Sequence, residues 1–291
     1  MVNKNSENLQ KYMEETRSCI ICNGNNFESW AKRSYFEAKK CKYCGMISVN
    51  PHLTNEGLSL YYKGYLAERL NEKVLLEQRK KTYLIDRDWI NNFIDHGKVL
   101  DVGCSGGQFL STFDPQKWER FGVDVEQSDA DFAEKNYGIS VKVGNFTELD
   151  FQENFDLIVI RGVIEHISEP IGFLKKVSEL LKPGGFFLIT ATPAGDSFAF
   201  SVYRGKWHLF TPPEHLHFFS VKLLSKKLKE LGLSLVSHHY QYEETPYANP
   251  NDDFKKMQND IILFNAGKSE QVQPSPPFPG SMITAVWRKQ I

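Results

Sequence analysis

In the last two thirds of the chain, short apolar runs alternate with amphipathic segments. β-branched and other apolar residues gather in five short runs, at residues 99–102, 121–124, 141–143, 157–160 and 186–190. Segments with helical periodicity lie between or after them, at residues 107–113, 128–136, 170–181 and 222–231. Strands that alternate with helices in this way form βαβ units around a parallel sheet. Two further strands, at residues 233–237 and 282–288, complete a predicted doubly wound α/β sheet of seven strands.

The pattern also divides the chain into three parts. Residues 1–54 consist of short, turn-rich pieces, whereas residues 55–97 are predicted to form a helical connector, with apolar residues at helical spacing. Residues 98–291 hold the α/β sheet. Within them, residues 242–280 form a connection far longer than usual, and such connections tend to be lids, binding loops or disordered segments. We treat this stretch as a candidate lid.

Charge and hydropathy narrow the range of partners. The chain carries 35 basic and 36 acidic side chains, a net charge of -1, so no overall field would draw it to nucleic acid or to an anionic membrane. No run approaches the roughly 18 apolar residues that span a bilayer, and the first residues lack the apolar core of a signal peptide. We therefore expect a cytoplasmic protein without membrane insertion, for which nucleic acid is not the favoured partner.

Four of the five cysteines form two pairs. Cys19 and Cys22 are separated by two residues, as are Cys41 and Cys44, and residues 23–40 lie between the pairs. This spacing is typical of zinc sites in which four thiolates complete a tetrahedron. No coordination position then remains for water. The predicted zinc is therefore structural, and it stabilises a segment too small to build its own core.

A glycine-rich turn follows the first predicted strand. Residues 98–107 run from an apolar strand into Gly103, Gly106 and Gly107, where backbone N–H groups and positive φ angles let a ligand approach closely. The spacing is not the GxGxxG of dinucleotide-binding proteins, which disfavours NAD. Asp124 ends the next strand, 21 residues beyond Gly103, where a carboxylate can accept both hydroxyls of a ribose. We therefore expect a ligand that contains a nucleoside.

Four motifs in order resemble those of the class I S-adenosylmethionine (SAM)-dependent methyltransferases. Residues 98–107 resemble the first motif, and residues 121–125 resemble the second strand. Residues 155–167 resemble the fourth strand with its Glu-His sequel, and residues 181–185 resemble the turn before the fifth strand. The resemblance covers residues 84–240, and it implies SAM as the cofactor.

The resemblance also implies roles for individual residues. Asp101 and Gly103 would hold the methionine end of SAM, Asp124 the ribose and Val125 one face of the adenine. Ser105, also expected at the cofactor, stands where the family often has glycine, and a positive φ there would cost about 1 kcal/mol. The remaining expected cofactor contacts are Cys104, Gly107, Arg161 and, at the adenine edge, Asn145 and Phe146.

The four-cysteine segment resembles the N-terminal zinc ribbon of a group of bacterial methyltransferases in sugar and cell-surface polysaccharide pathways. Residues 50–52 and the later Tyr61, Tyr62 and Tyr65 fit the pattern that follows the last cysteine in that group. This resemblance implies a carbohydrate acceptor. The basic residues around the ribbon leave RNA as an alternative partner; they are Lys32, Arg33, Lys39, Lys40 and Lys42.

Transfer of a methyl group to a hydroxyl requires a group that takes the hydroxyl proton, and histidine is the usual choice near neutral pH. His166 follows the fourth predicted strand, and His215 and His217 follow the fifth, at the edge where open α/β sheets bind ligands. We rank His215 first. In ubiquinone-type O-methyltransferases, which the Glu165-His166 pair resembles, a further glutamate three positions earlier helps to form a divalent-metal site. Gly162 occupies that position here, so we do not predict that metal.

These features predict a SAM-dependent O-methyltransferase acting on a sugar, a nucleotide-linked sugar or another hydroxylated small molecule. Three alternatives remain: an RNA methyltransferase that docks through the ribbon, a protein that binds SAM without catalysis and, more distantly, an oxidoreductase on the same type of sheet. Aromatic residues near the histidines are either a wall for the acceptor or part of the core; they are Tyr203, Trp207, Phe210, Phe218 and Phe219.

Overall fold

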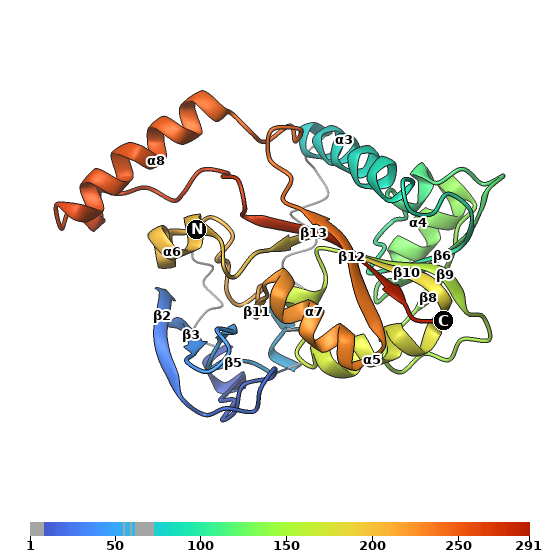
Figure 1. The fold of residues 1–291 in the computed structure, drawn as a ribbon, viewed down its shortest axis with the longest axis horizontal. Helices are drawn as coiled ribbons and strands as arrows, with labels where there is room; N and C mark the ends of the chain where they lie inside the picture. The colour runs from blue at the N-terminus through green and yellow to red at the C-terminus, as the bar shows by residue number, and fades with distance from the viewer. Residues whose placement is uncertain (1–8, 55, 59, 62–72) are drawn as a thin grey trace.

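The computed structural model describes residues 9–54, 56–58, 60–61 and 73–291, and it centres on a seven-stranded sheet (Figure 1). The strands run in the order β12-β13-β10-β9-β6-β7-β8; β13 is antiparallel to both of its neighbours, and the other four pairs of neighbouring strands are parallel. The doubly wound α/β prediction is therefore confirmed. The strands are β6 Gly97–Val102, β7 Trp118–Asp124, β8 Ser140–Val143, β9 Phe155–Arg161, β10 Leu181–Pro193, β12 Leu233–His239 and β13 Met282–Lys289.

Helices cover both faces of the sheet because its central strands are apolar on both faces. In β9, Ile158 and Ile160 pack with the buried faces of α5 and α7, whereas Leu157 and Val159 pack with residues of α3 and α4 on the other face. This alternation with a period of two places a hydrophobic core on each side. The helices are α3 Lys73–Ile90, α4 Gln127–Tyr137, α5 Pro170–Leu180 and α7 Val221–Glu230.

One predicted helix is wrong. Residues 107–113 form only a 3₁₀ turn, η2, at Leu110–Thr112. Gly107 has a φ of +75°, which is not helical, and Phe113 is already extended. Pro115 follows soon after, and a proline disfavours helix in the residue before it. Between the glycine-rich loop and β7 the chain therefore has room for little more than one helical turn. Residues 55, 59 and 62–72 of the predicted connector lie outside the described residues.

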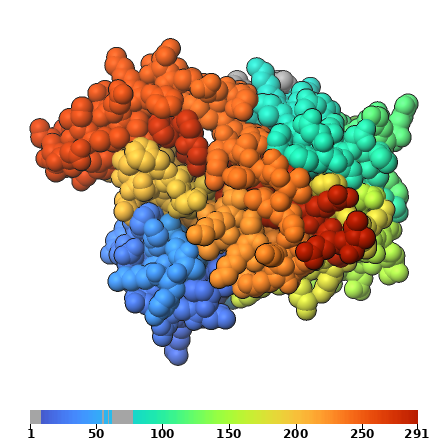
Figure 2. Space-filling model, in the orientation of Figure 1, coloured from blue at the N-terminus to red at the C-terminus, as the bar shows by residue number. Residues whose placement is uncertain are grey.

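The four-cysteine segment forms a small sheet that is completed by a strand from the main domain. Strands β2 Phe27–Arg33, β3 Phe36–Cys41 and β4 Ile47–Val49 form an antiparallel meander, and β11 His217–Phe218 pairs with β4. A second pair joins β1 Met13–Glu14 to β5 His52–Leu53. The N-terminal part therefore packs directly against the rest of the molecule, as the space-filling view shows (Figure 2).

A second hydrophobic core joins the ribbon to residues that follow β10. Helix α6 Phe198–Tyr203 and the 3₁₀ turn η4 Arg204–Lys206 carry the chain over the ribbon. The five aromatic residues that had two interpretations, namely Tyr203, Trp207, Phe210, Phe218 and Phe219, are at most 2% exposed. They are core residues, and the wall interpretation is wrong.

The long connection before β13 contains a helix of its own. Residues 242–280 hold α8 Pro250–Asn265 and the 3₁₀ turn η5 Ser269–Gln271. Helix α8 extends away from the sheet above α6 (Figure 1). It is joined to α6 by a hydrogen bond from the Tyr203 hydroxyl to Asp260 Oδ2, at 2.7 Å. None of the helices within the described ranges is long and apolar enough to cross a membrane.

Candidate active site and four-cysteine cluster

The turn after β6 brings the backbone into the conformation that the sequence predicted. Gly103 and Gly107 have φ angles of +77° and +75°, and Ser105 has a φ of +47°. A side chain at position 103 would lie 2.7 Å from Val163 Cγ2, so only glycine fits there. The strain at Ser105, about 1 kcal/mol, is offset locally because its amide donates to Asp124 Oδ2 at 2.7 Å and its hydroxyl donates to Asp129 at 3.0 Å.

Asp124 ends β7 beside this turn. Besides the Ser105 amide, its carboxylate accepts bonds from the backbone N–H groups of Val125 and Glu126, at 2.8 and 3.2 Å. Burial is the main cause that raises the pKa of Asp124. Val125 is 68% exposed. A rigid carboxylate next to an exposed apolar side chain can bind the hydroxyls and one face of a nucleoside.

Asp101 lies in β6, two residues before the first glycine of the turn. Its side chain is buried, and in the part of the chain that the structure describes Oδ1 has no hydrogen-bond partner. Burial raises the pKa of Asp101 to about 7, whereas the charge of Arg161 opposes this shift. An unsatisfied buried carboxylate oxygen is costly. A ligand with an ammonium group, such as the methionine end of SAM, would supply the missing donor, so the residues present fit that cofactor.

Other residues expected at the cofactor have different surroundings. Cys104 is buried, and burial raises the pKa of its thiol. The Asn145 amide donates to Glu148 Oε1 at 2.9 Å. Phe146 is 4% exposed, and its ring lies 4.9 Å from that of Phe173. The side chains of Cys104 and Phe146 therefore belong to the core.

Arg161, at the end of β9, is fixed by the connector helix. Its guanidinium bonds to Asp86 Oδ2 at 3.0 Å and to Thr82 Oγ1 at 2.9 Å, and it lies 4.6 Å from the Tyr83 ring centre. Asp86, which is fully buried, also accepts a bond from Thr190. The sequence analysis missed Asp86, because a single acidic residue in a helix gives no signal of burial.

Glu165, His166 and His215 form a cluster beside the cofactor turn. Glu165 and His166 belong to the 3₁₀ turn η3 Ile164–His166, which follows β9. The amide of Leu216 donates to the Glu165 carbonyl at 2.7 Å and so brings His215 alongside. Three ligand atoms, one from each of the three side chains, lie within 4.8 Å of one another. Val163, which limits position 103 in the cofactor turn, lies two residues before Glu165.

Each side chain of this cluster is oriented by a hydrogen bond. His166 Nδ1 lies 2.8 Å from the Glu214 carbonyl, and His215 Nδ1 lies 2.7 Å from the Leu209 carbonyl. The Thr192 hydroxyl donates to Glu165 Oε2 at 3.0 Å. Burial raises the pKa of Glu165 to about 7. The cluster therefore combines a carboxyl group with two imidazoles of fixed orientation.

His217, the third predicted base, lies elsewhere. It is 6% exposed, and its Nδ1 lies 3.1 Å from the Ser48 hydroxyl of β4. Burial lowers the pKa of His217 to about 4. The structure thus places His217 in the contact between β11 and the ribbon, two residues along the chain from the cluster.

The four predicted metal ligands come together. Cys19 Sγ and Cys44 Sγ are 3.5 Å apart, and Cys22 Sγ and Cys41 Sγ are 3.6 Å apart. All four sulfur atoms lie within 4.8 Å of one another. In a tetrahedron with Zn–S bonds of about 2.3 Å, the sulfur atoms are separated by roughly 3.8 Å. The arrangement therefore fits a zinc ion.

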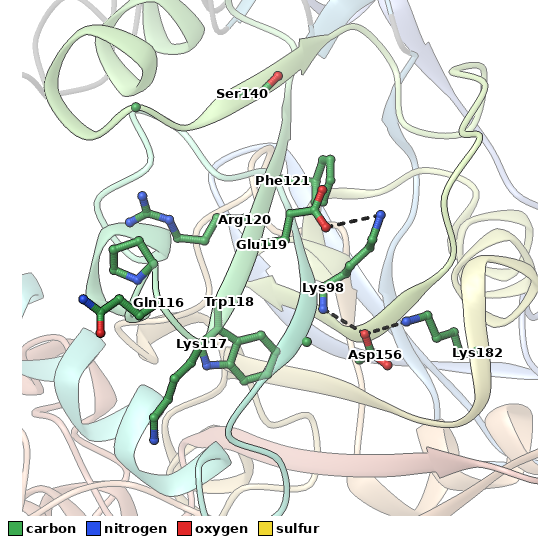
Figure 3. A pocket seen from close by; sticks show the side chains of 13 residues that line it. Lys98, Gln116, Lys117, Trp118, Glu119, Arg120, Phe121, Ser140, Asp156 and Lys182 are labelled. Carbon is green, nitrogen blue, oxygen red and sulfur yellow. Dashed lines mark hydrogen bonds and ion pairs between the residues drawn. The ribbon is translucent and has the colours of Figure 1, made fainter.

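A groove lies at the opposite edge of the sheet. It encloses about 700 Å³ between the amino ends of β6, β7, β8 and β9. Figure 3 shows its side chains, among which Lys182 pairs with Asp156 at 2.7 Å and Lys98 pairs with Glu119 at 3.3 Å. Open α/β sheets bind ligands at the carboxyl ends of their strands, so we do not place the cofactor in this groove.

The strand order, the glycine turn after the first strand of the sheet and the acidic residue after the second define a class I SAM-dependent methyltransferase. A family model for a methyltransferase domain matches residues 66–238, more than half of the chain. The chain therefore belongs to the methyltransferase-domain family.

Individual relatives agree with this classification. Ubiquinone biosynthesis O-methyltransferase of Cereibacter sphaeroides is 31% identical over 148 residues, which cover 46% of this chain and 57% of that protein. The chain thus matches little more than half the length of this curated relative. The fold resembles a candidate methyltransferase from Bacillus halodurans C-125, with a TM-score of 0.54 at 20% identity, covering 72% of this chain and 99% of the other. Magnesium protoporphyrin IX methyltransferase of Synechocystis, with bound S-adenosylhomocysteine, gives a TM-score of 0.52 at 10% identity over 81% of this chain and 95% of that protein.

Proposed function

We propose that this protein methylates a hydroxyl group of a small molecule, in the first place a sugar or a nucleotide-linked sugar. The observation that carries the proposal is the position of the Glu165–His166–His215 cluster next to the cofactor turn. Val163, two residues before Glu165, lies against Gly103 of that turn. When bound, SAM supplies an activated methyl group that is transferred by displacement at its carbon. The acceptor oxygen forms the new bond and must lose its proton.

The residues of the turn would hold the cofactor. Asp101 would accept from the ammonium group, Asp124 would accept from the ribose hydroxyls, and Val125 would contact the adenine. Ser105, Gly103 and Gly107 shape the backbone around these contacts. We keep Cys104, Asn145, Phe146 and Arg161 as residues that border this site. Arg161 would act indirectly, because its charge lowers the pKa values of Asp101 and Glu165.

The acceptor hydroxyl would lose its proton at the cluster. His215 is our first choice for the residue that takes this proton, and His166 is the second. His217 is assigned to the contact with the ribbon, because it is buried against Ser48. Oxygen as the acceptor atom is supported by relatives that are named O-methyltransferases. The sugar class is supported by the resemblance of the four-cysteine segment to the ribbons of polysaccharide-pathway enzymes.

We propose that Cys19, Cys22, Cys41 and Cys44 hold one structural zinc ion. The support is the close approach of their four sulfur atoms. We also propose that residues 242–280 form a cover over the acceptor side. His208, in the segment that leads to His215, bonds through Nδ1 to the Ser275 hydroxyl at 2.9 Å, so this connection contacts the segment that carries the cluster.

RNA docking through the ribbon is less favoured, because several of the basic residues have internal partners. Arg33 donates to the carbonyls of Gly205 and Trp207, at 3.0 and 2.8 Å. Lys40 lies 4.0 Å from the centre of the Trp30 ring. Arg33 thus joins the ribbon to the main domain and Lys40 packs within the ribbon, so these two cations are engaged inside the protein.

An acceptor screen tests the proposal. The purified protein is incubated with SAM and with nucleotide sugars, free sugars, phenols or a structured RNA, and S-adenosylhomocysteine is measured. We expect its release with a hydroxylated small molecule. Release with RNA alone would replace the proposal by the RNA alternative. Binding of SAM without turnover on any acceptor would favour a non-catalytic role.

A further inference from the structure

We propose that Phe198, Phe254 and Phe278 form a binding surface for an uncharged aromatic or aliphatic group of the acceptor. We call these three side chains the aromatic strip. They differ from the buried aromatic residues of the second core, because Phe198 is 53% exposed and Phe254 is 42% exposed. This inference deepens the proposed function and rests on it for the role of the acceptor. The binding of an uncharged group to the strip is independent of methylation.

The strip is assembled from three segments of the chain. Phe198 begins α6, Phe254 lies near the start of α8, and Phe278 lies shortly before β13 (Figure 1). The ring centre of Phe278 is 4.9 Å from that of Phe254 and 6.1 Å from that of Phe198, within the usual range of aromatic pairs. Tyr242 is buried, its ring centre lies 6.3 Å from that of Phe254, and its hydroxyl donates to Asp253 at 2.7 Å. A fixed neighbour therefore supports Phe254.

The topology of the sheet brings the strip to the edge that carries the cofactor turn. Strands β10 and β12 are both antiparallel to β13, so they run in the same direction as β9 and end at the same edge. At this edge the Ala194 N–H donates to the Ser281 carbonyl at 2.9 Å. Ala194 precedes Phe198 by four residues, and Ser281 follows Phe278 by three. The strip therefore lies beside the carboxyl ends of the strands, where open α/β sheets bind ligands.

The strip is also within reach of the Glu165–His166–His215 cluster. Thr192, near the end of β10, donates to Glu165 Oε2 at 3.0 Å. Phe198 follows Thr192 by six residues, and six residues span at most about 20 Å. An acceptor of a few linked rings can therefore place its hydroxyl at the cluster and another part on the strip.

Charges next to the strip disfavour an anionic group. Three carboxylates lie within two residues of strip members, against two cations; they are Asp196, Asp252 and Asp253, and Lys255 and Lys256. Lys256 is already paired with Asp260. A diphosphate would be repelled by the excess of carboxylates. Asp253 accepts from the Tyr242 hydroxyl and the Asn249 N–H, at 2.7 and 2.9 Å, so it needs no cation from a ligand. An uncharged group therefore fits the strip best.

The strip belongs to the long connection rather than to the cofactor domain. Phe254 and Phe278 lie in residues 242–280, beyond residue 238, where the match to the methyltransferase family ends. Aromatic side chains that meet at the surface, unlike a single exposed ring, mark a binding site. With a sugar hydroxyl at the cluster, the acceptor would be a glycoside that carries an uncharged aryl or alkyl group.

Binding of Nile red, an uncharged planar dye that fluoresces in apolar surroundings, tests the strip in the full-length protein. We expect saturable binding of one dye per chain. Phe198→Ala and Phe254→Ala should each raise the Kd about fivefold to tenfold, because an aromatic contact is lost. Phe254→Tyr keeps a ring and should bind as the wild type does. Ile262→Ala is the matched control, since Ile262 is 65% exposed two turns further along α8.

Paired acceptors test the role in catalysis. Aryl glycosides are compared with the methyl glycosides of the same sugars and with nucleotide-linked sugars, and S-adenosylhomocysteine is measured. We expect the lowest KM for aryl glycosides, and Phe254→Ala should raise that KM and leave kcat unchanged. A KM that Phe254→Ala leaves unchanged, or a preference for nucleotide-linked sugars, overturns the inference but supports the proposed function. Dye binding that both alanine variants weaken, without methylation of any hydroxyl, would leave the surface and refute the function.

Three further results overturn the inference. The first is equal dye binding by the wild type and both alanine variants, with unchanged melting temperatures and SAM affinities to show that the variants are folded. The second is a dimer in light scattering that Phe254→Ala converts into a monomer, because a second copy of the chain would then cover the strip. The third is sedimentation with phosphatidylcholine vesicles that Phe254→Ala abolishes, which would assign the strip to a membrane surface.

Discussion

The four-cysteine cluster and the Glu165–His166–His215 cluster are built in opposite ways. The four thiols come from two short loops of one small sheet, and the full set of four can enclose an ion completely. The other cluster has three donors of two kinds, drawn from segments about 50 residues apart, with one imidazole partly exposed to solvent. A closed set of ligands stabilises a fold, whereas an open set can bind a substrate. We therefore expect a structural role for the four-cysteine cluster and a chemical role for the other.

Backbone hydrogen bonds connect the ribbon to the Glu165–His166–His215 cluster. Val49 of the ribbon donates its N–H to the carbonyl of Leu216, and Leu216 donates its own N–H to the carbonyl of Glu165, at 2.8 and 2.7 Å. His215 directly precedes Leu216 in the chain. We infer that the ribbon holds the strand that positions His215. We therefore expect the four-cysteine cluster to support the position of His215 from a distance.

The largest effect is expected for Cys41→Ser. Loss of one ligand should release the zinc and unfold the ribbon, because the binding free energy of a structural zinc is also folding free energy, of order 10 kcal/mol. Methylation should then be lost, since β4 no longer supports β11, whereas SAM should still bind to the seven-stranded sheet. Elemental analysis, limited proteolysis and SAM titration measure the three outcomes. Lys42→Ala, an exposed neighbour in the same loop, is the control. A Cys41→Ser variant with full zinc content and an intact ribbon would contradict the assignment.

His215→Ala should change the rate and leave the fold intact. We expect single-turnover methylation to slow by about 10² to 10⁴, the usual range for loss of a group that handles a proton. The SAM affinity and the zinc content should stay as in the wild type, because His215 belongs to neither site. His96→Ala, at an exposed histidine, serves as the control. A near-normal rate with a lowered melting temperature would show that His215 only packs.

A smaller effect is expected at the cofactor turn. Asp124→Ala should weaken SAM binding by about one to two orders of magnitude, because a lost charged hydrogen bond costs about 1.5 to 3 kcal/mol. The zinc content should not change. Calorimetric titration with SAM measures the effect, and Asp131→Ala on the exposed face of α4 is the control. Equal affinities for wild type and Asp124→Ala would refute the ribose assignment.

The sequence predicted local features better than long-range ones. The glycine turn, the positions of the strands and the spacing of the four cysteines are each encoded within a few residues, so local patterns were enough. The pairing of Leu216 with Glu165 and of β11 with β4 joins segments far apart in the chain, and no local pattern encodes such contacts. For the same reason the sequence could not decide that Trp207 and Phe210 are core residues. Their burial depends on the ribbon that packs over them.

The smallest predicted effect is a pH dependence of SAM binding that arises from Asp101, whose Oδ1 has no hydrogen-bond partner among the described residues. Burial raises the pKa of Asp101 to about 7, so the carboxyl group is largely protonated at pH 6 and largely ionised at pH 8. Only the ionised form can pair with the ammonium group of SAM. The Kd for SAM should therefore rise about tenfold from pH 8 to pH 6, as expected for a group that titrates midway between them. Asp101→Asn should bind more weakly at pH 8 and lose most of this dependence, which separates Asp101 from groups that titrate on the cofactor itself. A wild-type Kd that is constant between pH 6 and 8 would mean that Asp101 keeps one protonation state in this range. Its buried oxygen would then have to be satisfied in another way than by the cofactor.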